Sequence, residues 1–317
     1  MGSGAWTSDD YEAFAKSRGR VVDSSGAVAG SYNNQDIFRS RDISAALNPR
    51  GVIRECCDSP EHPATVPVIL ALDVTGSMGK AAVEVAMKLN VIMTNLYDQV
   101  KDVEFMIMGI GDMACDKRPL QMSQFESDIR IADQLEQLYF EFGGGGNGWE
   151  SYSLAWYAGL HHTRLDCWQR GKKGIIITMG DEMLNPYIPV RGMMTSIQNV
   201  LGGKIDKDID TASLYAEASR MFEIFHLHIQ EGLHSFEDTK YSFSKYLDNQ
   251  HLFSVDMEMI SAIITKIVLR NMEQKMAMAA DIEGIHQVST DIDSQNIRSE
   301  EHTSTPVTRS SRMPSSA

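Results

Sequence analysis

The sequence lacks most of the features that mark secreted, membrane-spanning or disulfide-bonded chains. Only four of its 317 residues are cysteine; none forms a CxxC pair, and Cys56 and Cys57 are adjacent, which is poor geometry for a mutual disulfide. Reduced thiols and a cytoplasmic location are therefore expected. No apolar run reaches the roughly 18 residues that a membrane span needs. A signal peptide has a basic segment followed by an apolar one, and the first residues show neither, so no leader is expected.

Basic residues are also scarce. The chain has 29 Lys and Arg against 43 Asp and Glu, a formal net charge of −14, and no Lys/Arg cluster stands out. Nucleic-acid binding depends on such clusters, so no nucleic-acid partner is expected. With 43% hydrophobic and 23% charged residues, the composition is that of an ordinary globular protein.

Apolar runs alternate with segments of helical periodicity along most of the chain. Runs at 68–72, 103–110 and 175–179 are apolar on both faces, as central parallel strands are. Further strands are expected at 139–142 and 222–229, and helices at 129–138, 150–165, 213–221 and 257–276, besides a long one that ends at Tyr97. This alternation predicts an α/β fold, a doubly wound and mostly parallel sheet flanked by helices.

Composition divides the chain into three parts. Residues 1–50 are polar and predict an irregular N-terminal arm with one short helix near residues 9–16. Residues 51–277 hold the alternating pattern and predict the folded domain. Residues 278–317 lose periodicity and end in a low-complexity run, so a disordered C-terminal tail is expected.

The stretch LALDVTGSMGK, residues 70–80, ends a buried strand on a carboxylate. Asp73 is followed at once by Thr75 and Ser77. Burying an unpaired carboxylate costs several kcal/mol in effective terms, about the energy of a large core mutation. Asp73 should therefore have a partner, and the alternatives are a hydrogen-bonded helix cap, a phosphate-bearing ligand or a metal ion.

Two later loops carry oxygen-bearing side chains in equivalent places. Asn147 and Glu150 follow four glycines, and Asp181 follows the strand at 175–179. The carboxyl ends of parallel strands meet at one edge of such a sheet, where ligands bind. Oxygen ligands without cysteine suit a hard cation, Mg²⁺ first, with Mn²⁺ or Ca²⁺ as alternatives.

These residues carry a resemblance to a known family. Asp73-x-Thr75-x-Ser77 resembles the DxSxS signature of the von Willebrand factor A (vWA) domain family, with Thr in place of the first Ser. FGGGGNGWESYSLAW, residues 142–156, is similar to a GGDxPE-type second loop of that family, and Asp181 matches its aspartate after the fourth core strand. The resemblance covers roughly residues 60–275 and implies a Rossmann-like fold with a metal-ion-dependent adhesion site (MIDAS).

The resemblance also implies a function. Asp73, Thr75, Ser77 and Asp181 would approach the cation directly or through water, and Asn147, with Glu150 as a further candidate, would supply another position. The last coordination place would take an acidic residue of a partner protein, so the chain would be a binding module and not an enzyme. Cytosolic prokaryotic or phage members of this appearance work beside ATPases or kinases.

Other interpretations stay open at this stage. Asp73 is also a suitable helix cap, and Glu150 a first-turn helix acid. A Mg²⁺-dependent hydrolase or phosphatase would use Asp73 and Asp181 to polarise a phosphoryl oxygen, and an assembly protein would use the metal only for stability. His226, His228 and His234 either bind zinc or, as is more common, pack in the core.

Overall fold

Six strands form the central sheet, and five of them are parallel. The computed structural model describes residues 4–141 and 147–272, and the strand order is β12-β11-β7-β2-β3-β4. Only β4 runs antiparallel to its neighbour, β3. The bounds are β2 Val66–Asp73, β3 Val103–Ile110, β4 Leu120–Met122, β7 Gly174–Gly180, β11 Phe222–Ile229 and β12 Leu252–Val255.

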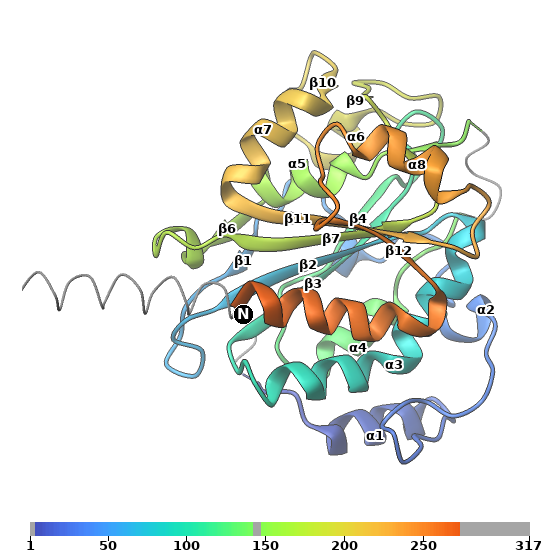
Figure 1. Ribbon diagram of the computed structural model, residues 1–317, viewed down its shortest axis with the longest axis vertical. Helices are drawn as coiled ribbons and strands as arrows, with labels where there is room; N and C mark the ends of the chain where they lie inside the picture. The colour runs from blue at the N-terminus through green and yellow to red at the C-terminus, as the bar shows by residue number, and fades with distance from the viewer. Residues whose placement is uncertain (1–3, 142–146, 273–317) are drawn as a thin grey trace, which may run out of the picture. The chain divides into compact units, whose positions relative to one another are not determined.

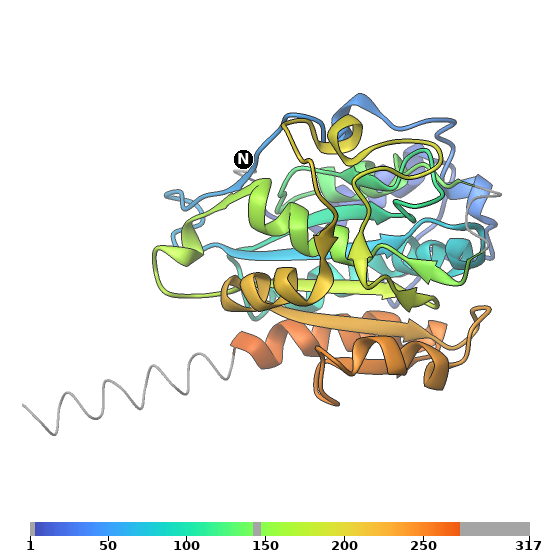
Figure 2. The ribbon, with the colours of Figure 1, turned by 90° about the horizontal axis from the view of Figure 1, so that it is seen from above.

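Helices cover both faces of this sheet (Figures 1 and 2). One face carries α1 Ser8–Ser17, α2 Asn34–Ile37, α3 Gly79–Tyr97 and α4 Arg130–Glu136, and the other carries α5 Ser153–His161, α6 Ile197–Leu201, α7 Thr211–Met221 and α8 Phe236–Phe243. A further helix begins at Ile260. A mostly parallel sheet with helices on both faces is a doubly wound α/β fold, so the predicted fold class is confirmed.

The described residues also contain short strands and 3₁₀ helices outside the central sheet. Three two-stranded sheets pair β1 with β6, β5 with β8, and β9 with β10. Their bounds are β1 Arg54–Cys56, β5 Trp149–Glu150, β6 Thr163–Leu165, β8 Met183–Leu184, β9 Tyr187–Ile188 and β10 Ile209–Asp210. The short 3₁₀ helices are η1 Ala45–Leu47, η2 Gly76–Met78, η3 Asp166–Trp168 and η4 Met257–Met259.

The three central strands are buried along their whole length. Every residue of β2, β3 and β7 is buried, and in the ladder Leu70 pairs with Ile107 on one side and Ile177 on the other. This burial explains why their sequences are apolar without alternation. Because the chain leaves β2 for β3 on one side and returns to β7 on the other, the carboxyl end of β2 is the topological switch point, where open α/β sheets bind ligands.

Two expected elements are wrong. The helix predicted over 150–165 is a short strand (β5), a nine-residue helix (α5) and a second strand (β6). Glu150 pairs in β5 and is not a first-turn helix acid. The strand predicted at 139–142 is absent from its described part, residues 139–141, where one isolated bridge joins Glu141 to Thr75. In both places pairing with a segment that is remote in the sequence overrode a local pattern.

The described residues up to 269 belong to one compact unit. The predicted tail, residues 278–317, the last four residues of the helix predicted over 257–276 and the four glycines at 143–146 lie outside the described residues. No helix in the described ranges has the length and hydrophobicity that crossing a bilayer requires.

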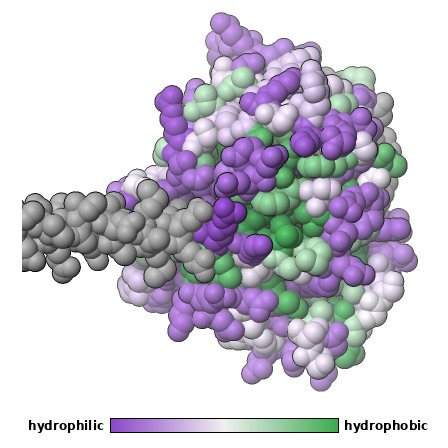
Figure 3. All heavy atoms as spheres, viewed as in Figure 1, coloured by the Kyte–Doolittle hydropathy of each residue, from purple (hydrophilic) through white to green (hydrophobic). Residues whose placement is uncertain are grey.

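On the face that Figure 1 presents, hydrophobic residues gather near the centre, with hydrophilic residues around them (Figure 3).

Candidate metal centre

The loop after β2 holds its three polar residues in direct contact. Asp73 is the last residue of β2, and its side chain is 1% exposed. Both the backbone N–H and the hydroxyl of Thr75 donate to Asp73 Oδ1, at 2.8 and 2.6 Å. The Ser77 hydroxyl lies 3.3 Å from that of Thr75, in the 3₁₀ turn that leads into α3. The pattern D-x-T-x-S therefore gathers one carboxylate and two hydroxyls at the switch point.

Asp181 completes this group from the loop after β7. Its Oδ1 accepts a hydrogen bond from the Ser77 hydroxyl at 3.4 Å, and its Oδ2 accepts the backbone N–H of Leu233. The loop at Gly232 passes so close that a Cβ there would lie 2.1 Å from Asp181 Cβ, so only glycine fits. The structure thus brings together four of the predicted residues: Asp73, Thr75, Ser77 and Asp181.

The hydroxyl groups are oriented in a way that suits a cation. Thr75 donates a hydrogen bond to Asp73, and Ser77 donates one to Asp181. The lone pairs of both hydroxyl oxygens are therefore available to bind a cation. No set of three or more His, Cys, Asp and Glu side chains in the described residues is arranged to hold a metal ion by itself. A cation at this edge would therefore depend on the two hydroxyls as well as on Asp73 and Asp181, which is a donor set that fits Mg²⁺.

Two more buried acids lie beside these four residues. Glu150, in β5, is fully buried, and Glu182, next to Asp181, is 6% exposed. Each has one carboxylate oxygen, Oε2, without a hydrogen-bond partner. Within the described parts of the chain, no Lys, Arg or His forms an ion pair with Asp73, Glu150, Asp181 or Glu182. Four buried carboxyl groups thus share one sheet edge without a cationic side chain.

The crowding of acids is visible in their pKa values. Burial, with the charge of Asp181 added to it, raises the pKa of Asp73 to about 7, against the hydrogen bonds from Thr75, which lower it. Burial and the charge of Asp73 raise the pKa of Glu182 to about 8, and the same two causes hold the pKa of Glu150 well above its ordinary value. A bound cation would oppose each of these shifts, because it stabilises the ionised carboxylates.

Asn147 lies in a neighbouring network and not with the four residues. Its amide nitrogen donates to Asp112 Oδ2 at 2.7 Å, and its side-chain oxygen accepts the backbone N–H of Trp149. Asp112 is fully buried and also accepts hydrogen bonds from Ser151 and Asn185. Asn147 therefore holds the second loop against the loop after β3.

Sequence reasoning missed Tyr152 as part of this site. The phenol is fully buried, and its hydroxyl donates to Asp73 Oδ2 at 3.0 Å. The backbone N–H of Glu182 donates to the same hydroxyl at 3.3 Å. In the sequence Tyr152 stands between Ser151 and Ser153, and the only signal of its role is its place two residues after Glu150.

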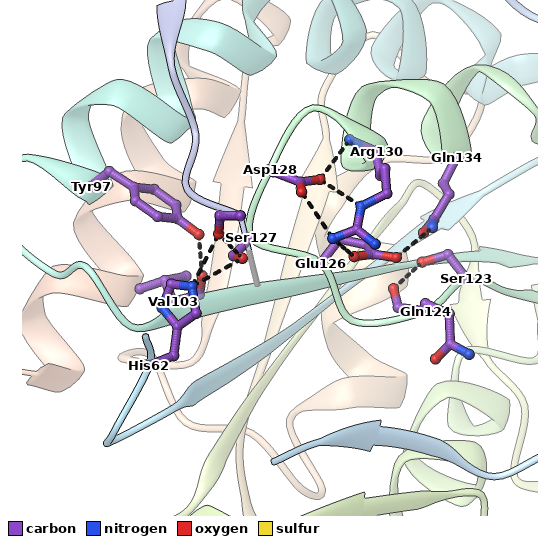
Figure 4. Close-up of polar contacts among 11 residues, drawn as sticks. His62, Tyr97, Val103, Ser123, Gln124, Glu126, Ser127, Asp128, Arg130 and Gln134 are labelled. Atoms are coloured by element: carbon purple, nitrogen blue, oxygen red, sulfur yellow. Dashed lines mark hydrogen bonds and ion pairs between the residues drawn. The ribbon is translucent and has the colours of Figure 1, made fainter. Parts of the chain in front are cut away.

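A second polar cluster lies beside the start of β3 (Figure 4). Ser127 Oγ is 3.3 Å from His62 Nε2, and His62 Nδ1 is 3.5 Å from Asp102 Oδ1, an order that resembles a Ser-His-Asp triad. His62 Nε2 also contacts the carbonyl oxygen of Gly4 at 3.0 Å. A carbonyl only accepts, so Nε2 carries a proton and cannot take one from Ser127, as a triad requires. The cluster ties the N-terminal segment to the sheet.

The histidines of β11 are packed core residues. His226 and His228 are 0% and 1% exposed. The His226 ring stacks on Phe243 with 3.8 Å between ring centroids, and its Nδ1 contacts the Thr178 hydroxyl at 2.9 Å. Burial lowers the pKa of both histidines, so both rings are neutral at pH 7.

Comparison with known proteins gives similarity of structure alone. No protein-family model matches the chain, and no curated protein matches it. Among solved structures, the pilus adhesin SpaC from Lactobacillus rhamnosus GG matches with a TM-score of 0.46 and 14% identity over 71% of this chain. The vWF domain of the pilus tip protein Mfa5 from Porphyromonas gingivalis matches with a TM-score of 0.46 and 10% identity over 68% of this chain and 96% of its own.

A third match is the SpRpn10 VWA domain, with a TM-score of 0.32 and 12% identity over 61% of this chain and 87% of its own. The chain spans only 31% of the SpaC chain. Two of these three structures are named as vWF or VWA domains, and each is similar to this chain at low identity. The fold class rests on the strand order and helix positions described above.

Proposed function

We propose that this chain is a protein-binding module whose binding site is the carboxyl edge of the central sheet. In this proposal Asp73, Thr75, Ser77 and Asp181 hold a Mg²⁺ ion, directly or through water. An acidic side chain of a partner protein takes the remaining coordination place, and the sequence resemblance suggests that the module acts beside an ATPase or kinase. Mn²⁺ or Ca²⁺ would occupy the same oxygen ligands.

The observation that carries the proposal is the set of buried acids without a cationic partner. Four carboxyl groups at one sheet edge would repel one another when ionised, and isolated buried carboxylates are costly. A divalent cation would offset this repulsion and would supply a positive charge at the surface. That charge, and not the acidic protein around it, would attract the partner's carboxylate.

The residues have distinct roles in this proposal. Thr75 and Ser77 offer hydroxyl oxygens, while Asp73 and Asp181 hold those hydroxyls by accepting hydrogen bonds from them. Glu150 and Glu182 add negative charge close by and favour a cation over a neutral ligand. Mg²⁺ keeps several water ligands at partly hydrated sites, so an exchangeable position for a partner oxygen is consistent with its chemistry.

The first experiment measures the metal itself. The wild-type protein is stripped with EDTA and titrated with MgCl₂ and MnCl₂, with thermal unfolding and calorimetry as readouts. Ser77→Ala and Asp181→Asn should each weaken binding by about tenfold or more, which is 1.4 kcal/mol or more. Ser25→Ala is the matched control, because the Ser25 hydroxyl also donates to an aspartate, Asp23, outside the site.

The second experiment tests partner binding. Affinity capture is carried out with Mg²⁺ and with EDTA, using the wild type, Ser77→Ala and Ser25→Ala. We expect a partner that the wild type and Ser25→Ala retain in Mg²⁺, and that EDTA and Ser77→Ala both release. Identical captured proteins under all conditions would overturn the binding-module proposal, even if the metal is bound.

A further inference from the structure

A tight turn on the α6 side of the molecule separates two hollows of similar size. It connects β9 to α6, in the upper part of Figure 1, and residues 191 and 196 bridge across it. One hollow has a volume of about 460 Å³ and the other about 440 Å³. The first is lined by Arg50, Lys117, Arg118 and residues 194–195, among others, and the second by Tyr187 and residues 191–193, among others.

The turn is held in place by backbone contacts. The N–H of Gly192 donates to the carbonyl of Thr195 at 3.0 Å, and the N–H of Met193 donates to the carbonyl of Ala114 at 2.7 Å. A Cβ at Gly192 would lie 1.9 Å from the carbonyl oxygen of Met113, so the turn packs directly on the loop after β3. The surface is therefore formed before any partner arrives.

Large apolar side chains are exposed on this turn. Met193 is 77% exposed and Met194 63% exposed, and Tyr187 nearby is 48% exposed. Together they are three of the eight large hydrophobic residues that are exposed in the described residues. Methionine is flexible and polarisable, and exposed methionines are common on surfaces that bind peptides.

The charge of the two hollows is opposite to that of the whole protein. Arg50, Lys117 and Arg118 line one hollow and Arg191 lines the other, while neither lining contains an acidic residue. Asp42 binds Arg118 at 2.7 and 3.0 Å. In the part of the chain that the structure describes, neither Arg50 nor Arg191 forms an ion pair. Two arginines that form no ion pair in the described residues thus lie beside exposed methionines on a protein of net charge −14.

We infer that this surface, residues 187–195 with Arg50 and Arg118, binds an extended segment of a partner protein that carries acidic residues beside large apolar ones. The carboxylates would pair with Arg50 and Arg191, for which the guanidinium fork is suited. The apolar side chains would cover Met193 and Met194 and fill the hollows. This inference goes beyond the proposed function, because it involves no metal ion and none of the residues of the metal centre.

The binding segment can be found without knowing the partner. A phage-displayed library of random dodecapeptides is panned on the wild-type protein in EDTA. Phages that also bind the double variant Arg50→Glu/Arg191→Glu are removed. We expect the remaining peptides to share acidic residues next to Leu, Ile, Met or aromatic residues. Enrichment of peptides without acidic residues, or no enrichment, would overturn the inference.

Affinities of a selected peptide then test the residues one by one. Fluorescence polarisation should show a loss of about tenfold for Arg50→Glu or Arg191→Glu, and a similar loss for Met193→Ser, since charged and apolar anchors both contribute. Lys172→Glu reverses a charge away from the surface and should bind as the wild type does. Unchanged binding by all three surface variants, with unchanged melting temperatures, would contradict the inference. Because every measurement is made in EDTA, failure here and failure of the metal proposal are separate results.

Discussion

At the scale of single residues, Tyr152 links two loops that are remote in sequence. Its hydroxyl donates to Asp73, 79 residues away, and accepts from the backbone of Glu182. A Cβ at position 180 would lie 2.0 Å from that hydroxyl, so Gly180 leaves the space that the phenol occupies. One buried hydroxyl therefore ties the loop after β7 to the last residue of β2.

Tyr152→Phe should destabilise the protein by about 1 kcal/mol, because the variant loses the hydrogen bond to Asp73 and leaves the buried N–H of Glu182 unpaired. Urea unfolding in EDTA measures this change. Tyr157→Phe is the control: no hydrogen bond of the Tyr157 hydroxyl is seen among the described residues, and the change should be within about 0.5 kcal/mol. Equal stabilities for the two variants would show that the Tyr152 bonds carry no net energy.

Glu104 gives a prediction about pH. It is 2% exposed on β3, one of its carboxylate oxygens has no hydrogen-bond partner, and burial raises its pKa above the ordinary value. The folded protein therefore holds this proton more tightly than the unfolded chain does. The contribution of Glu104 to stability falls as the pH rises from its unfolded pKa through its folded pKa.

Glu104→Gln removes this titration, so the variant should gain stability relative to the wild type between about pH 5 and about pH 8. The direction of this gain follows from the raised pKa of Glu104 in the folded protein. Urea midpoints of both proteins at the two pH values measure it. His62 and Glu126, which face Glu104, are unchanged in the comparison. A difference that does not vary with pH would refute the assignment.

At the scale of elements, the polar arm is bound to α3. Its helix, α1, lies where the sequence predicts a short helix, and Thr7 caps it by accepting the N–H of Asp10 at 3.1 Å. The Trp6 indole donates to Asn90 Oδ1 at 2.9 Å, and the Tyr11 hydroxyl donates to the carbonyl of Ala86 at 3.0 Å. Apolar and aromatic residues scattered among polar ones gave no periodic signal of this packing.

Trp6→Ala should lower the free energy of unfolding by about 3 kcal/mol, because it removes a large side chain that is only 7% exposed. Val21→Ala, at a position that is 69% exposed, should change it by less than about 0.5 kcal/mol. Chemical denaturation of both variants measures the difference. A small effect of Trp6→Ala would mean that the arm is not part of the cooperative fold.

At the scale of the whole molecule, the arm and the sheet belong to one compact unit, residues 1–269. We expect them to unfold together. In a variant that keeps Trp6 and replaces the other three tryptophans by Phe, Trp6 fluorescence reports the arm, while far-UV circular dichroism reports the whole unit. The two urea transitions should coincide, as cooperative unfolding requires. A fluorescence transition at lower urea would separate the arm from the sheet.

The sequence by itself determined the sheet and the place of four residues of the candidate metal centre. Apolar runs without alternation predict buried parallel strands, and the chain order puts the ends of β2 and β7 at one edge. That order also predicts that four polar residues lie close together, namely Asp73, Thr75, Ser77 and Asp181. The hydrogen bonds from Thr75 to Asp73, two residues away, were seen only in the structure.

Only the tertiary structure decided which other groups surround them. It paired Glu150 in β5, joined Asn147 to Asp112, brought Tyr152 to Asp73 and set the turn at 191–196 on the loop after β3. Each of these contacts joins residues that are between 34 and 79 positions apart along the chain. A local pattern reports which face of an element is buried, but the partner on that face depends on how the loops pack.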